Sequence, residues 1–281
     1  MHLFPSSIPS PTSGTMAIGS LRLTAYGMMI ALGVAAAVSL AGRRLTRSRA
    51  GTREDMSSIA TWGVIGGIVG ARLYHVVTDW NDFSGDLARI PMIWKGGLGI
   101  PGGLLGGVLC GVYRARRRGV SIPELLTAAA PAIPLAQSIG RWGNWWNQEL
   151  FGRATTLPWA LQISDDKLPA GYSSGTTFHP TFLYESLWNL ALCILLIQID
   201  RRMSLRPGRL FAVYLAGYFS GRFWIEGLRI DPAHVLGGLR LNQWVAAIVV
   251  VAAVEFLAID RRSRQEAVAS VMTSPADAKI P

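Results

Sequence analysis

Seven apolar stretches constrain this chain most, because each is long enough to cross a bilayer, which takes about 20 apolar residues. They lie at residues 24–42, 57–77, 97–114, 123–140, 180–199, 208–227 and 242–259. Only 16% of the 281 residues are charged, whereas a soluble domain typically has about a quarter. We therefore predict an all-α polytopic membrane protein. It would have seven transmembrane helices and a loop domain on its outer face between the fourth and fifth.

Basic residues gather in alternate connections between these stretches. The connections after the first, third and fifth stretches, together with the segment after the seventh, hold 16 of the 27 lysines and arginines. Short cationic loops stay on the cytoplasmic side, so we predict an outer N-terminus and a cytoplasmic C-terminus. This placement also accounts for the net charge of +10 without a nucleic acid partner.

Both ends of the chain are predicted to be disordered. Residues 1–20 are rich in proline and serine, and residues 263–281 are mostly small and polar; such segments bury too little apolar surface to fold. Residues 21–262 would form the transmembrane domain, with 141–179 as its outer head segment. The two cysteines, Cys110 and Cys193, each lie in an apolar run, which is typical of small core residues.

Several charged side chains fall where hydrocarbon would surround them, at a cost of about 2.5–3.5 kcal/mol each on insertion scales. Arg222 and Glu226 are four residues apart and share a helix face with Tyr218. A structural ion pair is one interpretation, and a functional site is the other. Further polar residues lie near the outer ends of their predicted helices: Arg22, Tyr26, Arg72, His75, His179, Tyr184 and Glu185. This asymmetry predicts a site that opens to the outer leaflet.

The stretch IGRWGNWWNQELFGR, residues 139–153, follows the fourth apolar run. In a helix its tryptophans would form one stripe, Trp142, Trp145 and Trp146, and its polar side chains would lie opposite, Arg141, Asn144, Asn147 and Gln148. Tryptophan prefers the membrane interface, so a simple anchor is one interpretation. Arginine binds two phosphate oxygens with its planar fork, and asparagine both donates and accepts. A pocket for a phospholipid headgroup is therefore the other interpretation.

The same stretch resembles the signature of the prolipoprotein diacylglyceryl transferase family, approximately G-R-x-G-N-x-x-N-x-E-x-x-G-R. Every fixed position is present: Gly140, Arg141, Gly143, Asn144, Asn147, Glu149, Gly152 and Arg153. HPTFLYE at 179–185 and YFSGRFWIEGLR at 218–229 resemble two further family motifs, and the early Arg22–Gly27 segment fits less tightly. The resemblance extends over residues 22–245, in the family's order.

The resemblance implies an enzyme of the bacterial cytoplasmic membrane. Such enzymes move an sn-1,2-diacylglyceryl group from phosphatidylglycerol to the lipobox cysteine of a prolipoprotein signal peptide, without a metal or cofactor. It implies catalytic roles for Arg141, Arg222, Glu149 and Glu226. It also implies a phosphatidylglycerol site formed by Arg141, Asn144, Asn147, Tyr26, Tyr218, Arg222, Arg153 and His179. A transporter or flippase for an anionic lipid or solute is the alternative, and a seven-helix receptor accounts for the helices only.

One position departs from the family pattern. Many members have a histidine in the glycine-rich turn before the third helix, where this chain has Pro101. Proline cannot accept a proton, so either that histidine is not a required base, or Glu149, Glu226 or His179 serves as the base. Divergence of the enzyme is a further interpretation. The glycines of 57–77 and 97–114 indicate close helix packing or, alternatively, a backbone that lines a ligand cavity.

Overall fold

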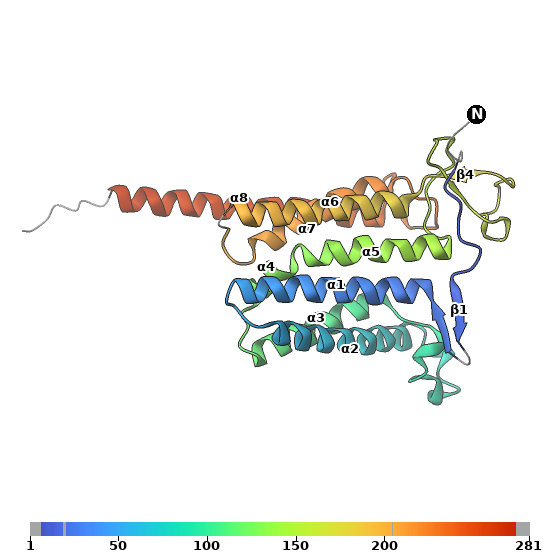
Figure 1. Ribbon diagram of the computed structural model, residues 1–281, viewed down its shortest axis with the longest axis horizontal. Helices are drawn as coiled ribbons and strands as arrows, with labels where there is room; N and C mark the ends of the chain where they lie inside the picture. The colour runs from blue at the N-terminus through green and yellow to red at the C-terminus, as the bar shows by residue number, and fades with distance from the viewer. Residues whose placement is uncertain (1–6, 19–20, 204, 274–281) are drawn as a thin grey trace, which may run out of the picture. The chain divides into compact units, whose positions relative to one another are not determined.

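The protein is mostly helical in a computed structural model that describes residues 7–18, 21–203 and 205–273, without the side chains of 16–18, 21–22, 95 and 260–273. Figure 1 shows its α-helices: α1 (Ala25–Arg47), α2 (Arg53–Thr78), α3 (Ile100–Arg117), α4 (Ile122–Ala129), α5 (Ala132–Asn147), α6 (Thr181–Arg202), α7 (Arg209–Glu226) and α8 (Leu241–Thr273). The strands form antiparallel pairs: β1 (Thr15–Ile18) with β2 (Leu21–Thr24), β3 (Leu161–Gln162) with β4 (Thr177–Phe178), and β5 (Val235–Leu236) with β6 (Leu239–Arg240). The chain divides into two compact units, one of residues 1–33 and 134–281 and one of residues 34–133.

Four helices in the described part of the chain are long and apolar enough to span a membrane. They are α1, α2, α6 and the Leu241–Ile259 part of α8. The predicted fourth span, 123–140, is interrupted, because α4 ends at Ala129 and α5 begins at Ala132. Pro131 and Pro134 lack the N–H groups that a continuous helix needs there. A multi-pass helical membrane protein is thus confirmed, but the count of seven is not.

Glycines bring α2 and α3 together within the 34–133 unit. A Cβ added to Gly102 would lie 2.3 Å from the carbonyl oxygen of Gly70, and one added to Gly66 would lie 2.4 Å from the sulfur of Cys110. Only glycine allows the two backbones to approach this closely. The packing interpretation of these glycines is therefore confirmed.

This packing predicts different outcomes for two neighbouring substitutions. A Cβ at Gly102 meets backbone at 2.3 Å, whereas the nearest atom to a Cβ at Gly103 is 3.3 Å away. Gly102→Ala is expected to cost about 1–3 kcal/mol, as overpacked cores do. Gly103→Ala should be nearly neutral, because alanine favours helix by up to about 1 kcal/mol. Thermal unfolding of both variants in detergent checks this; equal midpoints would contradict the close contact.

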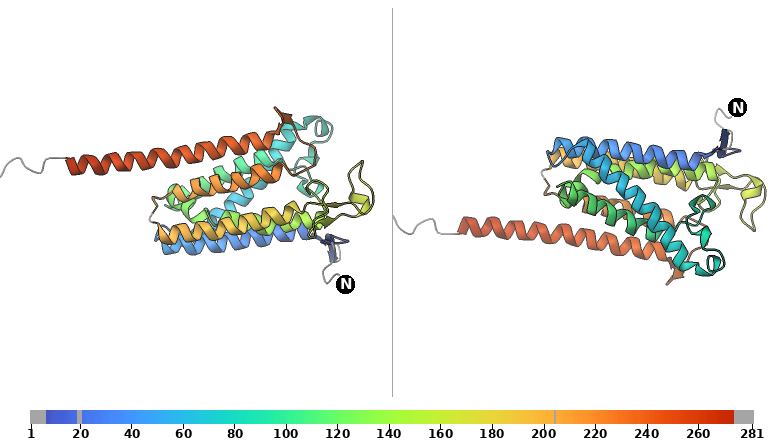
Figure 2. Two further views of the ribbon diagram at one scale, coloured as in Figure 1. Left: turned by 90° about the horizontal axis from the view of Figure 1, so that it is seen from above. Right: turned by 90° about the horizontal axis from the view of Figure 1, so that it is seen from below.

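The other unit contains α6, α7 and α8, with α7 packed against both of the others (Figures 1 and 2). α5 joins α6 through Ser138 and Ser186, since each serine hydroxyl donates to the other's carbonyl oxygen, at 2.8 and 3.0 Å. The start of α1 lies on α5, where a Cβ at Gly143 would meet the ring of Tyr26 at 2.6 Å. The head segment after α5 has its own small core of Phe151, Leu161, Ile163, Phe178 and Phe182.

The structure places strands and helix in parts of the two ends for which the sequence predicts disorder. Near the N-terminus, β1 pairs with β2, and the amide of Ile8 donates to the carbonyl of Ala160 at 2.6 Å. These backbone bonds hold a segment whose composition alone favours disorder. At the other end, α8 continues to Thr273 through residues that include good helix formers. Residues 1–6, 19–20 and 274–281 lie outside the description.

Candidate functional site

Residues 139–147 of the tryptophan-rich stretch form the last turns of α5, as its periodicity predicts. Trp142 and Trp145 meet edge to face with ring centroids 5.8 Å apart, and Trp145 also stacks on Phe182 of α6. This aromatic stripe fixes α5 against α6. It leaves Arg141 and Asn144 on the other side of α5, where polar side chains meet.

Gln148 ends the helix and differs from its predicted role. It has a positive φ of 54°, and its side chain is buried. Its amide nitrogen donates to the carbonyl of Pro11 at 3.0 Å and to the hydroxyl of Ser164 at 2.8 Å, while its oxygen accepts from the amide of Ser164. Gln148 therefore holds the N-terminal segment to the head instead of facing a headgroup. A capping role of this kind leaves no sequence pattern.

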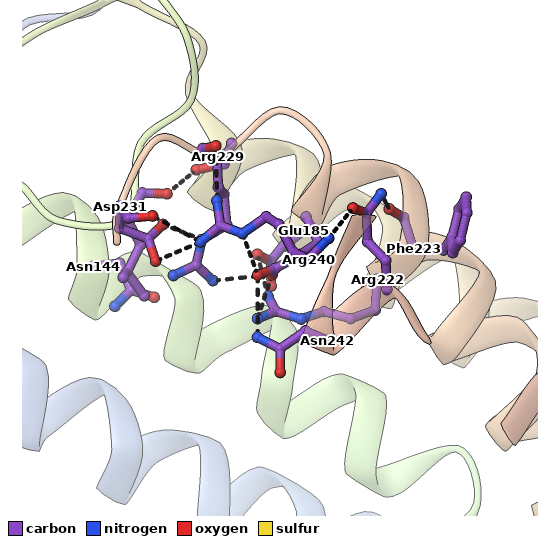
Figure 3. Close-up of polar contacts among 12 residues, drawn as sticks. Asn144, Glu185, Arg222, Phe223, Arg229, Asp231, Arg240 and Asn242 are labelled. Carbon is purple, nitrogen blue, oxygen red and sulfur yellow. Dashed lines mark hydrogen bonds and ion pairs between the residues drawn. The ribbon is translucent and has the colours of Figure 1, made fainter. Parts of the chain in front are cut away.

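Two arginines from different helices converge on one carboxylate, that of Glu185; Figure 3 labels Glu185 and one of the two arginines, Arg222. Glu185 of α6 forms an ion pair with Arg141 of α5, and its other oxygen lies 3.2 Å from Nη1 of Arg222 on α7. Glu185 is 6% exposed, and the two arginines are 20% and 16% exposed. The fold thus assembles two guanidiniums around one acid, with part of each arginine still accessible.

A second acid, Glu226, is completely buried. It extends the contacts of Arg141, Glu185 and Arg222 into a larger network of arginines and carboxylates. Its oxygens lie 2.7 Å from Nη2 of Arg222, 3.6 Å from Nη1 of Arg229 and 3.0 Å from Nε of Arg240. The amide of Asn242 donates to it at 3.1 Å. The predicted pairing of Arg222 with Glu226 is confirmed, but Glu226 serves three arginines.

Asp231 completes the network beyond the end of α7. Nε of Arg229 lies 2.7 Å from one of its oxygens, and Nη2 of Arg240 lies 2.9 Å from the other. Burial alone would raise the pKa of Asp231. The hydrogen bond from Arg229 and the charges of Arg229 and Arg240 outweigh it and hold that pKa below its usual range. Asp231 is therefore an anion at neutral pH.

Glu149 extends the network to the head segment. Its Oε1 accepts hydrogen bonds from the side-chain amides of Asn144 at 2.8 Å and Asn147 at 3.1 Å. The amide oxygen of Asn144 in turn accepts a long bond from Arg141, at 3.4 Å. Leu150, directly after Glu149, has a positive φ of 59°, an uncommon conformation for leucine. These bonds connect the two predicted asparagines to Arg141 through one carboxylate.

His179 lies in the head just before α6, within hydrogen-bond distance of Tyr184. Its Nδ1 is 3.1 Å from the Tyr184 hydroxyl, which also accepts from the indole of Trp159 at 3.0 Å. Partial burial, and then the nearby charge of Arg153, lower the pKa of His179 below its ordinary value of 6.5. His179 is therefore neutral at pH 7 and able to accept a proton.

Comparison of the sequence with known proteins shows the family of this chain. A sequence model of the family described as prolipoprotein diacylglyceryl transferase matches residues 14–259. The chain belongs to the prolipoprotein diacylglyceryl transferase family. It is 46% identical over 263 residues to phosphatidylglycerol–prolipoprotein diacylglyceryl transferase 1 of Streptomyces coelicolor, covering 92% of this chain and 75% of the relative. It is 49% identical over 260 residues to the enzyme so named in Frankia alni, covering 92% and 68%.

The remaining residues expected from the family resemblance lie in the same unit as the network. Tyr218 stacks on Tyr214, with ring centroids 5.8 Å apart, one turn before Arg222 on α7. Tyr26 is partly exposed against Gly143. The side chain of Arg153 is exposed. Its backbone N–H donates to the carbonyl of Leu228, and its carbonyl accepts from the amide of His179. The side chain of Arg22 lies outside the described residues.

Arg72, which the sequence analysis grouped with the outer polar residues, has a structural role within its own unit. It is buried in the 34–133 unit and donates to four carbonyl oxygens of the loop between α2 and α3, those of Arg89, Ile90, Gly96 and Gly97, at 2.6 to 3.0 Å. These hydrogen bonds give the charge of Arg72 a structural role, because they satisfy backbone carbonyl groups of the loop. Nδ1 of His75, one turn further, lies 2.8 Å from a carboxylate oxygen of Asp79.

The transferase-family motifs do not contain every member of the network. Arg240 lies on β6, outside the motifs quoted from the sequence. Glu185 and Arg229 lie inside those motifs; Glu185 was grouped with the outer polar residues but given no role, and Arg229 was not singled out. Glu185 could have been found from the sequence. It is an acid one turn inside an apolar helix, where burying its charge costs free energy unless a basic side chain pairs with it. The sequence gives no signal for Arg240, because only the turn between α7 and α8 brings Arg240 to Glu226.

Proposed function

We propose that this protein transfers an sn-1,2-diacylglyceryl group from phosphatidylglycerol to the thiol of a lipobox cysteine in a prolipoprotein signal peptide. The family and the names of its relatives support this reaction. The observation that carries the assignment of residues is the convergence of Arg141 and Arg222 on Glu185. Two guanidiniums a few ångströms from one carboxylate can also share one phosphate, because each has N–H groups beyond those that the acids use.

The reaction forms a carbon–sulfur bond and breaks the carbon–oxygen bond to the phosphate. The bonding electrons remain on the phosphate oxygen, which leaves as glycerol phosphate with an additional negative charge. Donors placed where charge develops lower the barrier. Arg141 and Arg222 are the groups that we assign to this phosphate, with Asn144, Asn147, Tyr26, Tyr218 and Arg153 around the headgroup.

Glu226 takes a different role from the catalytic one that the resemblance implies. It is fully buried and surrounded by three guanidiniums, so neither a thiol nor water reaches it. A carboxylate in this setting orients Arg222 and keeps the charge of the arginines balanced. We therefore propose Glu226 as a positioning residue.

Glu149 is the proton acceptor that the hydrogen bonds favour over His179. It is partly exposed, and it connects to Arg141 through Asn144. Its Oε2 makes no hydrogen bond within the described residues, so this oxygen can receive the thiol proton. The guanidiniums assist by stabilising the thiolate, whose free pKa is about 8.5.

Two substitutions separate these bases. Glu149→Gln is expected to lower kcat by about 10²–10⁴-fold, the usual contribution of general base catalysis, whereas His179→Gln should change it less than about tenfold. Because the pKa of His179 is lowered, a reaction that used it would lose rate only as pH falls through a value below 6.5. Initial rates between pH 5.5 and about 8.5 measure both effects. An inactive His179→Gln beside an active Glu149→Gln would transfer the role to His179.

We place the protein in the bacterial cytoplasmic membrane with seven spans, taking α4 and α5 together as the fourth. The arginine-rich connections support a cytoplasmic C-terminus and an outer N-terminus. This orientation puts the head segment and the arginine network toward the outer face, where a secreted prolipoprotein arrives.

The direct test combines the purified protein, phosphatidylglycerol and a synthetic lipobox peptide. Mass spectrometry of the peptide should show a diacylglyceryl adduct on its cysteine, and a peptide with serine there should remain unmodified. The protein in lipid vesicles also tests the transporter alternative. Movement of labelled phosphatidylglycerol between leaflets without any adduct would favour that alternative and overturn the transferase.

A further inference from the structure

The turn that carries Glu149 has an uncommon backbone conformation on both sides of this residue. In the described part of the chain, three residues other than glycine have a positive φ. Two of the three flank Glu149, namely Gln148 at 54° and Leu150 at 59°. Such residues rarely adopt this conformation, and it persists only where the surrounding structure holds it. The contacts that hold this turn therefore also determine where the carboxylate of Glu149 lies.

The side chain of Gln148 provides the contacts on the first side. Glycine is the usual residue with a positive φ just after a helix, so the backbone alone does not favour glutamine here. The side chain is 8% exposed. Its amide group makes three hydrogen bonds, one with the carbonyl of Pro11 and two with Ser164, at 2.8 to 3.0 Å. These bonds compensate for the unfavourable backbone and join the turn to the head.

Pro11 belongs to an N-terminal segment, residues 8–14, that is fixed along its length. The amide of Ile8 donates to the head at 2.6 Å, the carbonyl of Pro9 accepts from α5 at 3.1 Å, and the carbonyl of Gly14 accepts from the first residue of α1 at 2.7 Å. The segment thus runs from the head past the end of α5 to α1 (Figure 1). Gln148 therefore bonds to a partner that is itself held in place.

The contacts on the second side come from α6. The hydroxyl of Thr181, the first residue of α6, donates to the carbonyl of Leu150, and Thr181 is 1% exposed. The amide of Glu149 itself donates to the carbonyl of Asn144 at 3.1 Å. The peptide that carries Glu149 is therefore held from both directions. Its Oε1 lies where the side-chain amides of Asn144 and Asn147 reach it.

We infer that Gln148 is a positioning residue for the proposed reaction and that it acts through Glu149. By joining the turn to the N-terminal segment and the head, it keeps the carboxylate against the two asparagines, one of which contacts Arg141. The inference rests on the role proposed for Glu149. The family signature leaves the position of Gln148 unspecified, so the resemblance assigns this residue no role.

Gln148→Gly tests the inference, because glycine adopts a positive φ without strain and only the side-chain bonds are lost. We expect kcat for adduct formation to fall by about 10–10²-fold, the effect of misplacing a catalytic group by about 1 Å. The KM for phosphatidylglycerol should stay within about twofold, because the arginines that bind the phosphate are unchanged. Ser164→Ala removes one of the three bonds and should lower kcat less.

Gln162→Ala is the matched control. Gln162 is an exposed glutamine of the same head segment, and its side chain makes none of these bonds, so this variant should retain the wild-type kcat. If Gln148→Gly does not give a monodisperse protein, Gln148→Asn takes its place. Asparagine also tolerates a positive φ and is too short to reach both partners. An unchanged kcat in the Gln148 variant would overturn the inference.

A double-variant cycle determines whether Gln148 acts through Glu149. In the Glu149→Gln background, Gln148→Gly should change the remaining rate by less than about twofold, because the carboxylate that Gln148 positions is already absent. Loss of the same factor in both backgrounds would show a purely structural role and would overturn the inference. A larger loss in Gln148→Gly than in Glu149→Gln would overturn it as well.

Hydrogen–deuterium exchange separates this inference from the proposed function. The amides of residues 8–14 and 149–152 should exchange faster in Gln148→Gly than in the wild type, and Gln162→Ala should change neither segment. Adduct formation by the wild type, with rate and exchange unchanged in Gln148→Gly, would reject the inference alone. Faster exchange in Gln148→Gly with no adduct in the wild type would reject the proposed reaction, while the hold of Gln148 on the Glu149 turn would be upheld.

Discussion

Arg141→Gln and Arg222→Gln are each expected to lower kcat for adduct formation by about 10²–10³-fold, the usual loss when one donor to a developing anion is removed. The reason lies in the geometry of Glu185, which both arginines contact. A phosphate between the two guanidiniums would lose half of its charged donors in either variant. Because the charge develops in the transition state, the loss should appear in kcat more than in the KM for phosphatidylglycerol.

Lysine at the same positions separates charge from geometry. Arg141→Lys and Arg222→Lys keep the positive charge but lose the planar fork that binds two oxygens. If the fork matters, the lysine variants should recover only part of the lost rate. Arg201→Gln, which removes an exposed arginine remote from the network, is the control and should retain wild-type kcat. Full activity of both glutamine variants would remove the phosphate role from these arginines.

The helical part of the site was predictable because local spacing determines it. Arg222 and Glu226 are four residues apart, so any helix places them together, and the tryptophans of α5 form a stripe for the same reason. The resemblance to the family also placed Asn144, Asn147 and Glu149 in one site, and the structure joins them by hydrogen bonds.

The contacts between elements were not predictable from spacing. Glu185 connects Arg141 to Arg222 only because α6 packs beside both α5 and α7, and no pattern within α6 identifies its partners. Arg240 reaches Glu226 through the β5–β6 turn, fourteen residues further along the chain. The break before α5 escaped detection for another reason. Hydropathy measures apolar length, and the prolines that interrupt 123–140 scarcely change it.

Glu226→Gln is expected to reduce the free energy of unfolding by about 3–5 kcal/mol, as the loss of one member of a buried ion pair does. Glutamine has nearly the same shape, so the change is mainly one of charge. Glu226 has no exposed surface, and Arg222, Arg229 and Arg240 all contact its oxygens. Without its charge, three partly or fully buried guanidiniums would repel one another in a region that water does not screen.

Asp231→Asn is the matched comparison for this prediction. Asp231 contacts two of the same arginines but is 27% exposed, so water can replace part of its interaction. Its substitution should therefore cost clearly less than Glu226→Gln. Thermal and denaturant unfolding in one detergent measures both, and the order of the two losses decides the result. If Asp231→Asn is the more damaging, the network is centred on the turn after α7, and Glu226 does not position Arg222 in the way proposed.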